Sequence, residues 1–448
     1  MNIVIAGAGA VGMYLSKMLV ENNHNVTLID KNEERLRIAS SHLDLMTICG
    51  SSSLLSVLEQ ADAENADLII AVTSDQDANF LTCILGKKLG IKTTIARINS
   101  QEYLIETETE VYRSLGVDTM IFPEMIAATE ICEIIKQNAA TETFSFCNEK
   151  LVLLQLKIEE NAEVKGKTLK EIIMQDPSLD YRAVSILREG RTLMPTGEDI
   201  FLPNDEVYVI TKREKIDKLL RISGSKNIAI KNIMIIGASE VGIIAAKELE
   251  KDYNVKLIEK NKDLCFELAG ILKNTLIINA DGHETNTLED EGLSKMDAFI
   301  SVTENTEANI FFCLIAKKRG AKKTIALIED IEFIELSHNI GVDTNINKKL
   351  IAASNIHRYT LEAEISASKC LNGVEADVFE FVVKKGARIT TKKVSELNFP
   401  KNAILGGYIR DDESFIVTGN THFKEGDHIV VFSVPNVIHQ VEQFFIVH

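Results

Sequence analysis

The sequence lacks several features that would indicate whole classes of protein. None of its stretches reaches the ~18 consecutive apolar residues that a membrane-spanning helix requires, so we expect a protein that works outside the lipid. It also has no excess of positive charge. The net charge of −17 repels nucleic-acid phosphates and anionic lipid headgroups, so direct binding to DNA or to a bilayer is not expected.

Paired cysteines and a secretory signal are missing as well. The seven cysteines are scattered, without a Cys-x-x-Cys pair or a histidine spaced as a metal partner, and are interpreted as reduced, small apolar residues. The chain runs from Met1 straight into an apolar strand, with no Lys or Arg before Lys17, unlike the charged start of a secretory signal. These absences favour a cytoplasmic protein with no metal site.

Motifs for catalysis are absent too. The sequence has no G-x-S-x-G, H-E-x-x-H or Walker lysine motif, and the nine histidines do not recur at matching positions of the repeat described below. His283 stands in a polar segment and is interpreted as an exposed loop residue. Lys165 and Lys167 flank Gly166 without a preceding phosphate loop, which indicates a turn. We therefore predict no catalytic residue.

What the chain does contain is a long internal repeat. Residues 2–12, NIVIAGAGAVG, match 232–242, NIMIIGASEVG, and residues 66–90 match 297–320. Gly7 and Gly237, like Thr73 and Thr303, are separated by 230 residues, a spacing too regular for chance. At 448 residues, with 45% hydrophobic and 26% charged residues, the chain is long enough for several folded domains. The chain is a duplication.

Each copy begins with short β-branched runs that alternate with helical segments. In the first copy we expect strands at 2–6, 26–30, 45–49, 67–72 and 93–98, with helices at about 10–22, 32–41, 51–59 and 76–89. Alternation of this kind predicts an α/β fold, a doubly wound parallel sheet of the Rossmann type. A last strand end is expected around 119–123, and Pro123 begins a helix that leads out of the domain.

A smaller module follows each parallel-sheet unit. From about residue 148 the pattern changes to short alternating strands with turn residues, and residues 379–433 repeat it, which predicts small α+β domains. We expect a joint between the two copies near SGSKN at 223–227. The predicted domains are 1–123, 140–224, 230–348 and 367–448.

A glycine fingerprint opens the first copy. Gly7, Gly9 and Gly12 form G-x-G-x-x-G between the first strand and helix, and Asp30 follows at the end of the next strand. The glycines allow a tight turn, close approach of phosphates and helix packing, and Asp30 would accept hydrogen bonds from ribose hydroxyls. The acid favours NAD(H) over NADP(H), and ATP or ADP could use the same contact. The alternative is a tight turn alone.

Other polar positions of the first copy have two interpretations each. Thr73 and Ser74 follow the fourth strand at the edge where ligands of such folds lie, although Thr73 and Asp75 could serve only to cap the next helix. Arg97 ends the fifth strand and could meet a phosphate or an acidic neighbour, or be a plain surface residue. The second copy has Leu327 at that place.

The second fingerprint departs from the pattern at one glycine. Ser239 replaces the middle glycine, whereas Gly237, Gly242 and Glu259 are retained. A side chain there narrows the room for a pyrophosphate. We expect weaker binding or a different ligand, with an empty structural site as the alternative.

These motifs, duplicated and each followed by a small domain carrying TGED or TGNT, resemble the RCK (regulator of potassium conductance) family. The resemblance rests on GAGAVG, LID at 28–30, GSSS at 50–53, AVTSDQDAN at 71–79 and IARIN at 95–99. The two-copy arrangement is similar to the peripheral regulatory subunits of bacterial Trk-type potassium uptake systems. Carried over by position, and with the last glycine of the first fingerprint, the implied ligand-contacting residues are Gly7, Ala8, Gly9, Ala10, Val11, Gly12, Asp30, Thr73, Ser74, Arg97, Gly237, Ala238, Ser239, Glu240, Val241 and Glu259.

The resemblance implies a regulator and not an enzyme. It implies binding of NAD(H) or adenine nucleotides, and a ring, which we expect to be a homotetramer, on the cytoplasmic face of an integral membrane potassium-translocating subunit of the TrkH or TrkG type. Nucleotide binding would bias the ring between shapes that favour an open or a closed pathway. The main alternative is an NAD-dependent dehydrogenase, because the fold also serves hydride transfer, but the small modules offer no convincing catalytic set.

Overall fold

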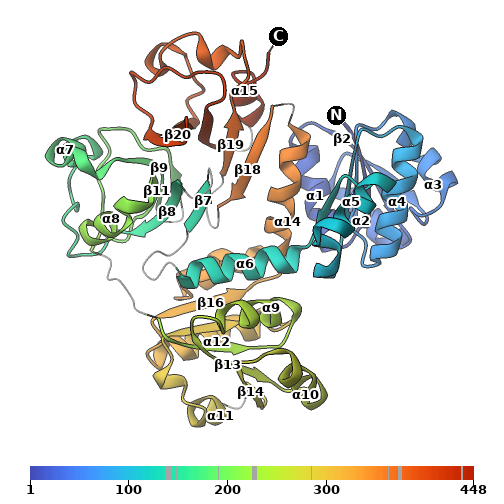
Figure 1. Ribbon diagram of the computed structural model, residues 1–448, viewed down its shortest axis with the longest axis horizontal. Coiled ribbons are helices and arrows are strands. Elements are labelled where there is room, and N and C mark those ends of the chain that lie inside the picture. Colours follow the sequence, from blue (N-terminus) through green and yellow to red (C-terminus); the bar gives the residue numbers. More distant parts are fainter. Residues whose placement is uncertain are drawn as a thin grey trace. The chain divides into compact units, whose positions relative to one another are not determined.

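The computed structural model describes residues 1–136, 143–146, 150–189, 191–224, 230–283, 285–361, 363–371, 376–434 and 437–447. Within these residues the chain forms two parallel and two antiparallel sheets, which alternate along the sequence (Figure 1). The predicted joint at 223–227 falls partly on residues outside the described ones. No helix in the described ranges is long and apolar enough to cross a membrane.

The first parallel sheet has six strands in the order β3-β2-β1-β4-β5-β6. Its central strand β4, with the sequence LIIA, is buried along its whole length, as expected for a strand covered by helices on both faces. The predicted doubly wound fold is therefore confirmed. The elements in chain order are β1 (Asn2–Ala6), α1 (Ala10–Glu21), β2 (Asn25–Asp30), α2 (Glu33–His42), β3 (Met46–Cys49), α3 (Leu55–Gln60), β4 (Leu68–Ala71), α4 (Gln76–Leu89), β5 (Thr93–Arg97), α5 (Glu106–Leu115), β6 (Thr119–Ile121) and α6 (Pro123–Lys136).

The first antiparallel sheet has five strands in the order β10-β9-β11-β8-β7. Alternating apolar residues of β8, β9 and β11 pack against the helix that follows them, which gives the module its own core. The predicted small α+β module is confirmed. Its elements are β7 (Thr143–Phe146), β8 (Leu151–Lys157), α7 (Leu169–Gln175), β9 (Tyr181–Arg188), β10 (Arg191–Leu193), β11 (Glu206–Lys212) and α8 (Ile216–Ile222).

The second copy repeats both sheets with the same strand orders. The second parallel sheet runs β14-β13-β12-β15-β16-β17, and the second antiparallel sheet runs β18-β19-β22-β20-β21. The elements are β12 (Asn232–Ile236), α9 (Glu240–Leu249), β13 (Asn254–Glu259), α10 (Lys262–Ile271), β14 (Leu276–Asn279), α11 (Thr285–Asp290), β15 (Ala298–Ser301), α12 (Thr306–Lys318), β16 (Lys323–Leu327), α13 (Glu332–Asn339), β17 (Thr344–Ile346), α14 (Lys348–His357), β18 (Ile365–Cys370), β19 (Asp377–Val382), β20 (Ala403–Arg410), β21 (Glu413–Ile416), β22 (His428–Ser433) and α15 (Ile438–Glu442).

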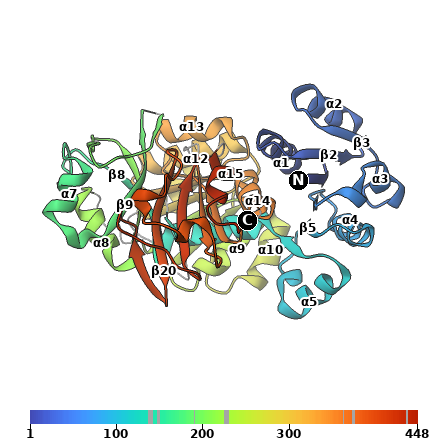
Figure 2. The same cartoon turned by 90° about the horizontal axis from the view of Figure 1, so that it is seen from above.

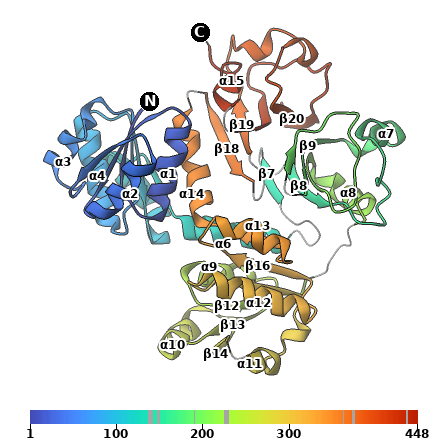
Figure 3. The ribbon, with the colours of Figure 1, turned by 180° about the vertical axis from the view of Figure 1, so that it is seen from behind.

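The chain divides into two compact units, and the division does not follow the order of the sequence. One unit comprises Met1–Ile126 together with Lys348–Leu361, so that α14 belongs with the first parallel sheet although it follows the second. Ala352, Ala353 and Ile356 of α14 are buried in the same apolar cluster as Leu15 of α1 (Figures 1 and 3). The sequence pattern did not foresee this exchange.

The other unit holds the remaining sheets. There α6 lies against α9, where the Cys132 thiol is 3.9 Å from the Ala245 carbonyl oxygen. The two antiparallel sheets pack face to face, so that β9 lies beside β20 (Figure 2). Gly406 makes room for the Ile210 side chain between them, because a Cβ atom at that position would stand 2.1 Å from Ile210 Cδ1.

Candidate nucleotide-binding sites

The strand order of each parallel sheet reverses at its first strand. β1 pairs with β2 on one side and with β4 on the other, and β12 pairs in the same way with β13 and β15. In open α/β sheets such a reversal leaves a crevice outside the carboxyl ends of the strands, where ligands bind. The structure brings the loops after β1, β2 and β4, which carry most of the predicted site residues, to this edge.

The turn between β1 and α1 can be built only from glycine at two of its positions. Gly7 has φ +110°, and a Cβ atom there would stand 2.9 Å from the Thr73 amide nitrogen. At Gly12 a Cβ atom would lie 1.8 Å from the Gly7 carbonyl oxygen, so the helix could not approach the strand. Both roles predicted for these glycines are confirmed.

Gly9 is different, because its position faces open space. Apart from Gly9 itself and its two chain neighbours, no described residue has a heavy atom within 4 Å of a Cβ atom built on Gly9. Gly9 occupies the N-cap position of α1, and no side chain forms a capping hydrogen bond at this helix end. The first-turn N–H groups and the positive end of the helix dipole thus stay available, which is the arrangement that binds a phosphate.

Four predicted contacts need a correction or a qualification here. The side chains of Val11 and Val241 are buried, at 8% and 1% exposure, so only their backbone atoms face the turn. Ala10 and Glu240 are the first residues of α1 and α9, and their N–H groups belong to the first helical turns. Any contact from Val11 or Val241 would therefore come from the main chain, whereas the side chains of Ala10 and Glu240 are exposed.

Asp30 holds the glycine turn itself. Its Oδ2 atom accepts a hydrogen bond of 2.5 Å from the Ala8 amide, and its Oδ1 atom accepts one of 2.7 Å from the Asn32 amide. An ionised carboxylate has about four lone-pair sites, so two remain for ribose hydroxyls. Asp30 is thus a structural tether of the turn, and its contact with ribose hydroxyls stays a prediction.

A buried asparagine, which the sequence marked only as part of the repeat, supports the loop after β4. Asn79 is 1% exposed, and its Oδ1 atom accepts hydrogen bonds from the Thr73 amide at 2.9 Å and the Thr73 hydroxyl at 2.7 Å. Its Nδ2 atom donates to the carbonyl oxygens of Thr73 and Arg97. Asn79 therefore fixes the ends of β4 and β5 relative to each other, and Thr73 faces inward while Ser74 is exposed.

Arg97 meets an acidic neighbour. Its guanidinium donates a hydrogen bond of 2.8 Å to Glu124 Oε1, and the Glu124 side chain is only 12% exposed. Asp75 caps α4, because its Oδ1 atom accepts from the Ala78 amide at 3.1 Å. The capping interpretation is thus confirmed for Asp75, whereas the Thr73 hydroxyl donates to Asn79 Oδ1 and does not cap the helix. Arg97 has the acidic partner, and its contact with a phosphate stays a prediction.

The second site keeps the framework of the first. Gly237 has φ +96°, and Glu259 accepts hydrogen bonds from the Ala238 amide at 2.9 Å and the Asn261 amide at 2.7 Å. Asn309 is 1% exposed, accepts a hydrogen bond from the Thr303 amide, and donates to the carbonyl oxygens of Thr303 and Leu327. It thus links the fourth and fifth strands of the second sheet as Asn79 does in the first.

The second site differs where a ligand would lie. The Ser239 hydroxyl donates a hydrogen bond of 2.6 Å to the Val302 carbonyl oxygen and accepts a longer one, 3.4 Å, from the Gly242 amide, so it caps α9. Leu327 stands in the place of Arg97, and no ion pair of the Arg97–Glu124 kind can form there. The helix N-terminus that is uncapped in the first copy already has a side-chain partner in the second.

His283, interpreted from the sequence as a loop residue, lies on the surface near the second site. Its side chain is 65% exposed, with Nδ1 2.8 Å from Asp281 Oδ1, and its ring meets Phe312 edge-on at 5.1 Å. This placement agrees with the loop interpretation.

The cysteine interpretation is confirmed for four of the seven residues. Cys83, Cys132, Cys265 and Cys313 are free and buried, and burial raises the pKa of Cys132 to about 12, so it stays a neutral thiol at physiological pH. Cys49 is free and exposed.

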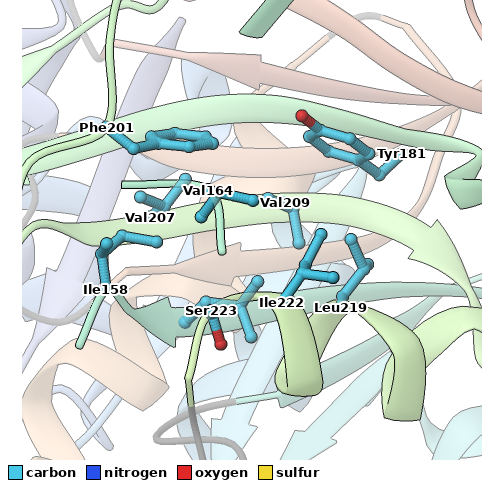
Figure 4. Close-up of a pocket in the computed structure, with 10 residues that line it drawn as sticks. Ile158, Val164, Tyr181, Phe201, Val207, Val209, Leu219, Ile222 and Ser223 are labelled. Atoms are coloured by element: carbon cyan, nitrogen blue, oxygen red, sulfur yellow. The ribbon is translucent and has the colours of Figure 1, made fainter. Parts of the chain in front are cut away.

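The first antiparallel sheet covers a small apolar cavity of about 20 Å³ (Figure 4). Tyr181 and Phe201 lie on one side of it and Leu219, Ile222 and Ser223 on the other, and the Tyr181 hydroxyl has no hydrogen-bond partner among the described residues. In the second copy stacked Phe381 and Phe445 occupy the corresponding core. A cavity of this size holds about one water molecule, so it is not a nucleotide site.

Comparison with known proteins gives the same domain order. The family model of the TrkA-N domain matches residues 3–123 and 233–348, and that of the TrkA-C domain matches residues 153–224 and 378–446. Trk system potassium uptake protein TrkA homolog 1 of Methanosarcina mazei is 31% identical over 99% of this chain and 100% of its own length. Trk system potassium uptake protein TrkA of Haemophilus influenzae is 31% identical over the whole of both chains.

Solved structures share the fold at low sequence identity. The structure described as "GsuK channel bound to NAD" superimposes with a TM-score of 0.62 at 16% identity, covering 99% of this chain and 78% of that one. The structure described as "Crystal structure of the GsuK bound to ADP" gives a TM-score of 0.51 at 14% identity, covering 80% and 68%. With both domain types matched twice and full-length relatives at about 30% identity, the chain belongs to the TrkA family of Trk system potassium uptake proteins.

Proposed function

We propose that this protein is the nucleotide-binding regulatory subunit of a Trk-type potassium uptake system. The observation that carries the proposal is the open, uncapped glycine turn at the switch point of the first parallel sheet, within a chain that has full-length relatives named Trk system potassium uptake proteins. Nucleotide binding there would change the balance between two arrangements of the domains, and that balance would open or close a partner's pathway.

The ligand that suits the first site is NAD(H) or an adenine nucleotide. A pyrophosphate would take the N–H groups in front of Gly9, and the free lone pairs of Asp30 would accept the ribose hydroxyls. The GsuK structures described as bound to NAD and to ADP share this fold, which supports both ligand classes. The contacts proposed for binding in the first copy are the main chain from Gly7 to Gly12, with Asp30, Thr73, Ser74 and Arg97.

The second site is proposed as a weaker or different nucleotide site. Its tether Glu259 and its glycine turn are in place, but the Ser239 hydroxyl already accepts from the Gly242 amide, a donor that a phosphate would use. The proposed contacts are Gly237 to Val241 and Glu259.

A regulatory role without turnover fits the residues present. The charged groups nearest the first site serve as tethers and partners: Asp30 binds the turn, and Arg97 binds Glu124. We therefore propose that the protein is not an enzyme, although the parallel-sheet fold is shared with dehydrogenases.

Assembly into a ring is supported by apolar side chains exposed at matching positions of the two copies. Leu81, Val111 and Leu115 are 44%, 54% and 50% exposed, and their counterparts Phe311, Leu336 and Ile340 are 56%, 50% and 47% exposed. A face that stays apolar in both copies of a duplication indicates contact with another copy of the chain. We propose a homotetramer attached to the cytoplasmic face of the membrane through a TrkH- or TrkG-like potassium-translocating subunit.

The function is tested by flux measurements. The chain would be reconstituted in liposomes with the potassium-translocating subunit of the same organism, and rubidium uptake would be measured with NAD⁺, NADH, ATP or ADP. We expect at least one nucleotide to change uptake several-fold in the wild type and not in Gly9→Asp. Uptake indifferent to all four nucleotides, or consumption of NADH with a metabolite, would refute the proposal.

Assembly is tested by the mass of the complex in solution. Light scattering should give four chains for the wild type, and smaller assemblies for Val111→Glu and Leu336→Glu. Ile38→Glu, which changes another exposed apolar residue outside the matched face, serves as the control. A monomeric wild type would refute the ring.

We propose that four segments fold independently: 1–123, 140–224, 230–348 and 367–448. The helix α14, which follows the third segment, is the exception because it packs on the first. Expression of residues 1–123 with and without a supplied 348–361 peptide tests this, and we expect the peptide to stabilise the segment.

A further inference from the structure

One contact in the larger unit joins two sheets through a histidine. His338 of α13 belongs to the second parallel sheet, and its Nε2 atom lies 3.0 Å from the Oε1 atom of Glu206, the first residue of β11 in the first antiparallel sheet. The Glu206 side chain is 12% exposed and the His338 side chain 37% exposed. The contact is thus partly sheltered from solvent.

The carboxylate of Glu206 is held in place by a second hydrogen bond. Its Oε2 atom accepts a hydrogen bond of 2.7 Å from the amide of Gln155, which is 6% exposed, so the carboxylate cannot rotate freely. The fixed Oε1 atom then faces His338. Because burial makes an unpaired carboxylate costly, Glu206 gains most when the imidazole is protonated.

The charged groups around His338 come from three elements. Glu206 on β11 favours the protonated ring, and so does Asp343, which lies before β17 and is itself paired with Lys317. Lys157 on β8, the strand neighbour of Glu206, disfavours the protonated ring. The position of His338 in the last turn of α13 also favours a cation. The hydrogen bond to Glu206 is the largest influence, and it raises the pKa of His338 above its usual value.

We propose that His338 and Glu206 form a proton-controlled contact that fastens α13 to the first antiparallel sheet and is weakened when His338 loses its proton. The sign follows from the direction of the shift. The contact contributes fully below the ordinary histidine pKa of ~6.5 and is lost as pH rises through the higher folded-state value. A rise in pH through this raised pKa therefore loosens α13.

The helix concerned is the one that presents Leu336 and Ile340 to solvent. The proton thus acts on the segment that carries the exposed apolar side chains of the second copy. The first copy has Arg113 at the position equivalent to His338, a residue that stays charged at every physiological pH. The second antiparallel sheet has His428 at the position equivalent to Glu206, where it pairs with Glu380 at 2.7 Å inside one sheet.

The test is hydrogen exchange of the full-length protein at pH 6.0 and pH 8.5, corrected for the intrinsic exchange rate at each pH. In the wild type, amides of residues 332–341 should lose about threefold in protection at the higher pH, the size expected for a partly exposed ion pair. His338→Gln should show the low protection at both pH values. His338→Arg, which borrows the residue of the first copy, should stay protected at both.

His428→Gln is the matched control, because it removes a histidine–carboxylate pair that lies within one sheet, and it should behave like the wild type. Amides of α9 should not respond in any variant. Equal wild-type protection at the two pH values, or a pH response that persists in His338→Gln, would overturn the proposal. Neither outcome depends on nucleotide binding.

Discussion

The two parallel sheets of this chain are duplicates that have diverged only at certain places. Both keep a left-handed glycine after the first strand, an acid that binds the turn, and a buried asparagine that brackets the fourth and fifth strands. They differ at the middle of the glycine turn, where the first copy has the open Gly9 and the second has Ser239, which caps a helix. They also differ at the end of the fifth strand, where the first copy has Arg97, paired with Glu124, and the second has Leu327.

The difference separates what the fold needs from what a ligand needs. Positions whose atoms are packed against backbone, such as Gly7 and Gly237, cannot change without moving the sheet. Positions that face open space can change freely if no ligand requires them. Under the proposed function, we therefore expect a phosphate ligand to bind the first copy more tightly than the second, which has Ser239 and Leu327 at these positions.

The largest effect is expected from the asparagine brackets, which both copies share. Asn79→Ala leaves several backbone groups of the β4 and β5 loops without partners and should destabilise that region by ~3 kcal/mol. Asn309→Ala should cost the second copy at least as much, because Asn309 also accepts a bond from Ser301. Hydrogen exchange of β4 and β15 reports each copy separately.

The exposed Asn65→Ala is the control for the brackets and should change little. If Asn79→Ala lowered the protection of β4 but Asn309→Ala left that of β15 unchanged, the two copies would not share this framework.

The next effect concerns the ion pair that only the first copy has. Arg97→Leu copies the second site and leaves the largely buried Glu124 carboxylate without its closest partner, so we expect ~2 kcal/mol of destabilisation. Thermal unfolding of the single variant and of Arg97→Leu with Glu124→Gln checks this. The double variant should recover most of the loss, and a single variant as stable as the wild type would mean that the pair is unimportant.

A smaller effect is expected when the middle residue of the turn is exchanged between copies. Ser239→Gly frees the Gly242 amide in the first turn of α9, and Gly9→Ser would occupy the equivalent amide of α1. Each is a change of ~1 kcal/mol, or about fivefold in nucleotide affinity. Calorimetric titration with ADP should show tighter binding in the first variant and weaker binding in the second. Changes in the same direction in both would contradict the role assigned to the cap.

The smallest effect concerns helix caps after the fourth strands. Asp75 caps α4 with a charge and Asn305 caps α12 without one. Asp75→Asn should lose ~0.5 kcal/mol of helix-dipole interaction, and Asn305→Asp should gain a similar amount. Thermal unfolding at low and at high salt checks this, since only the charge effect should disappear at high salt.

Much of the fold could be predicted because its signals are local. β1 at Asn2–Ala6 and α4 at Gln76–Leu89 lie where the alternating apolar runs placed them. The helix α5, Glu106–Leu115, was missed although Val111 and Leu115 are spaced as an apolar helical stripe; none of its residues is buried, and this stripe is exposed. Tyr112 of α5 instead stacks on Phe80 at 4.4 Å.

The candidate site was predictable only in part for the same reason. The glycine turn and the acid can be recognised by their spacing in the sequence. Asn79 cannot, because in the sequence it is an ordinary polar residue of a helix, and its role depends on contacts that form only in the folded loops. The packing of α14 on α1 depends on residues more than three hundred positions apart. A periodic pattern predicts that such a helix exists but not which surface it covers.

The most direct test of the inequality between the copies is calorimetric titration of NAD⁺, NADH, ATP and ADP into the wild type, Gly9→Asp and Ser239→Asp. Gly9→Asp places a negative charge where the phosphate would lie, so we expect at least ~100-fold loss at the tight site. Ser239→Asp should leave the tight site unchanged. If instead both variants lose binding equally, or the wild type binds none of the four nucleotides, then the first copy is not the principal nucleotide site.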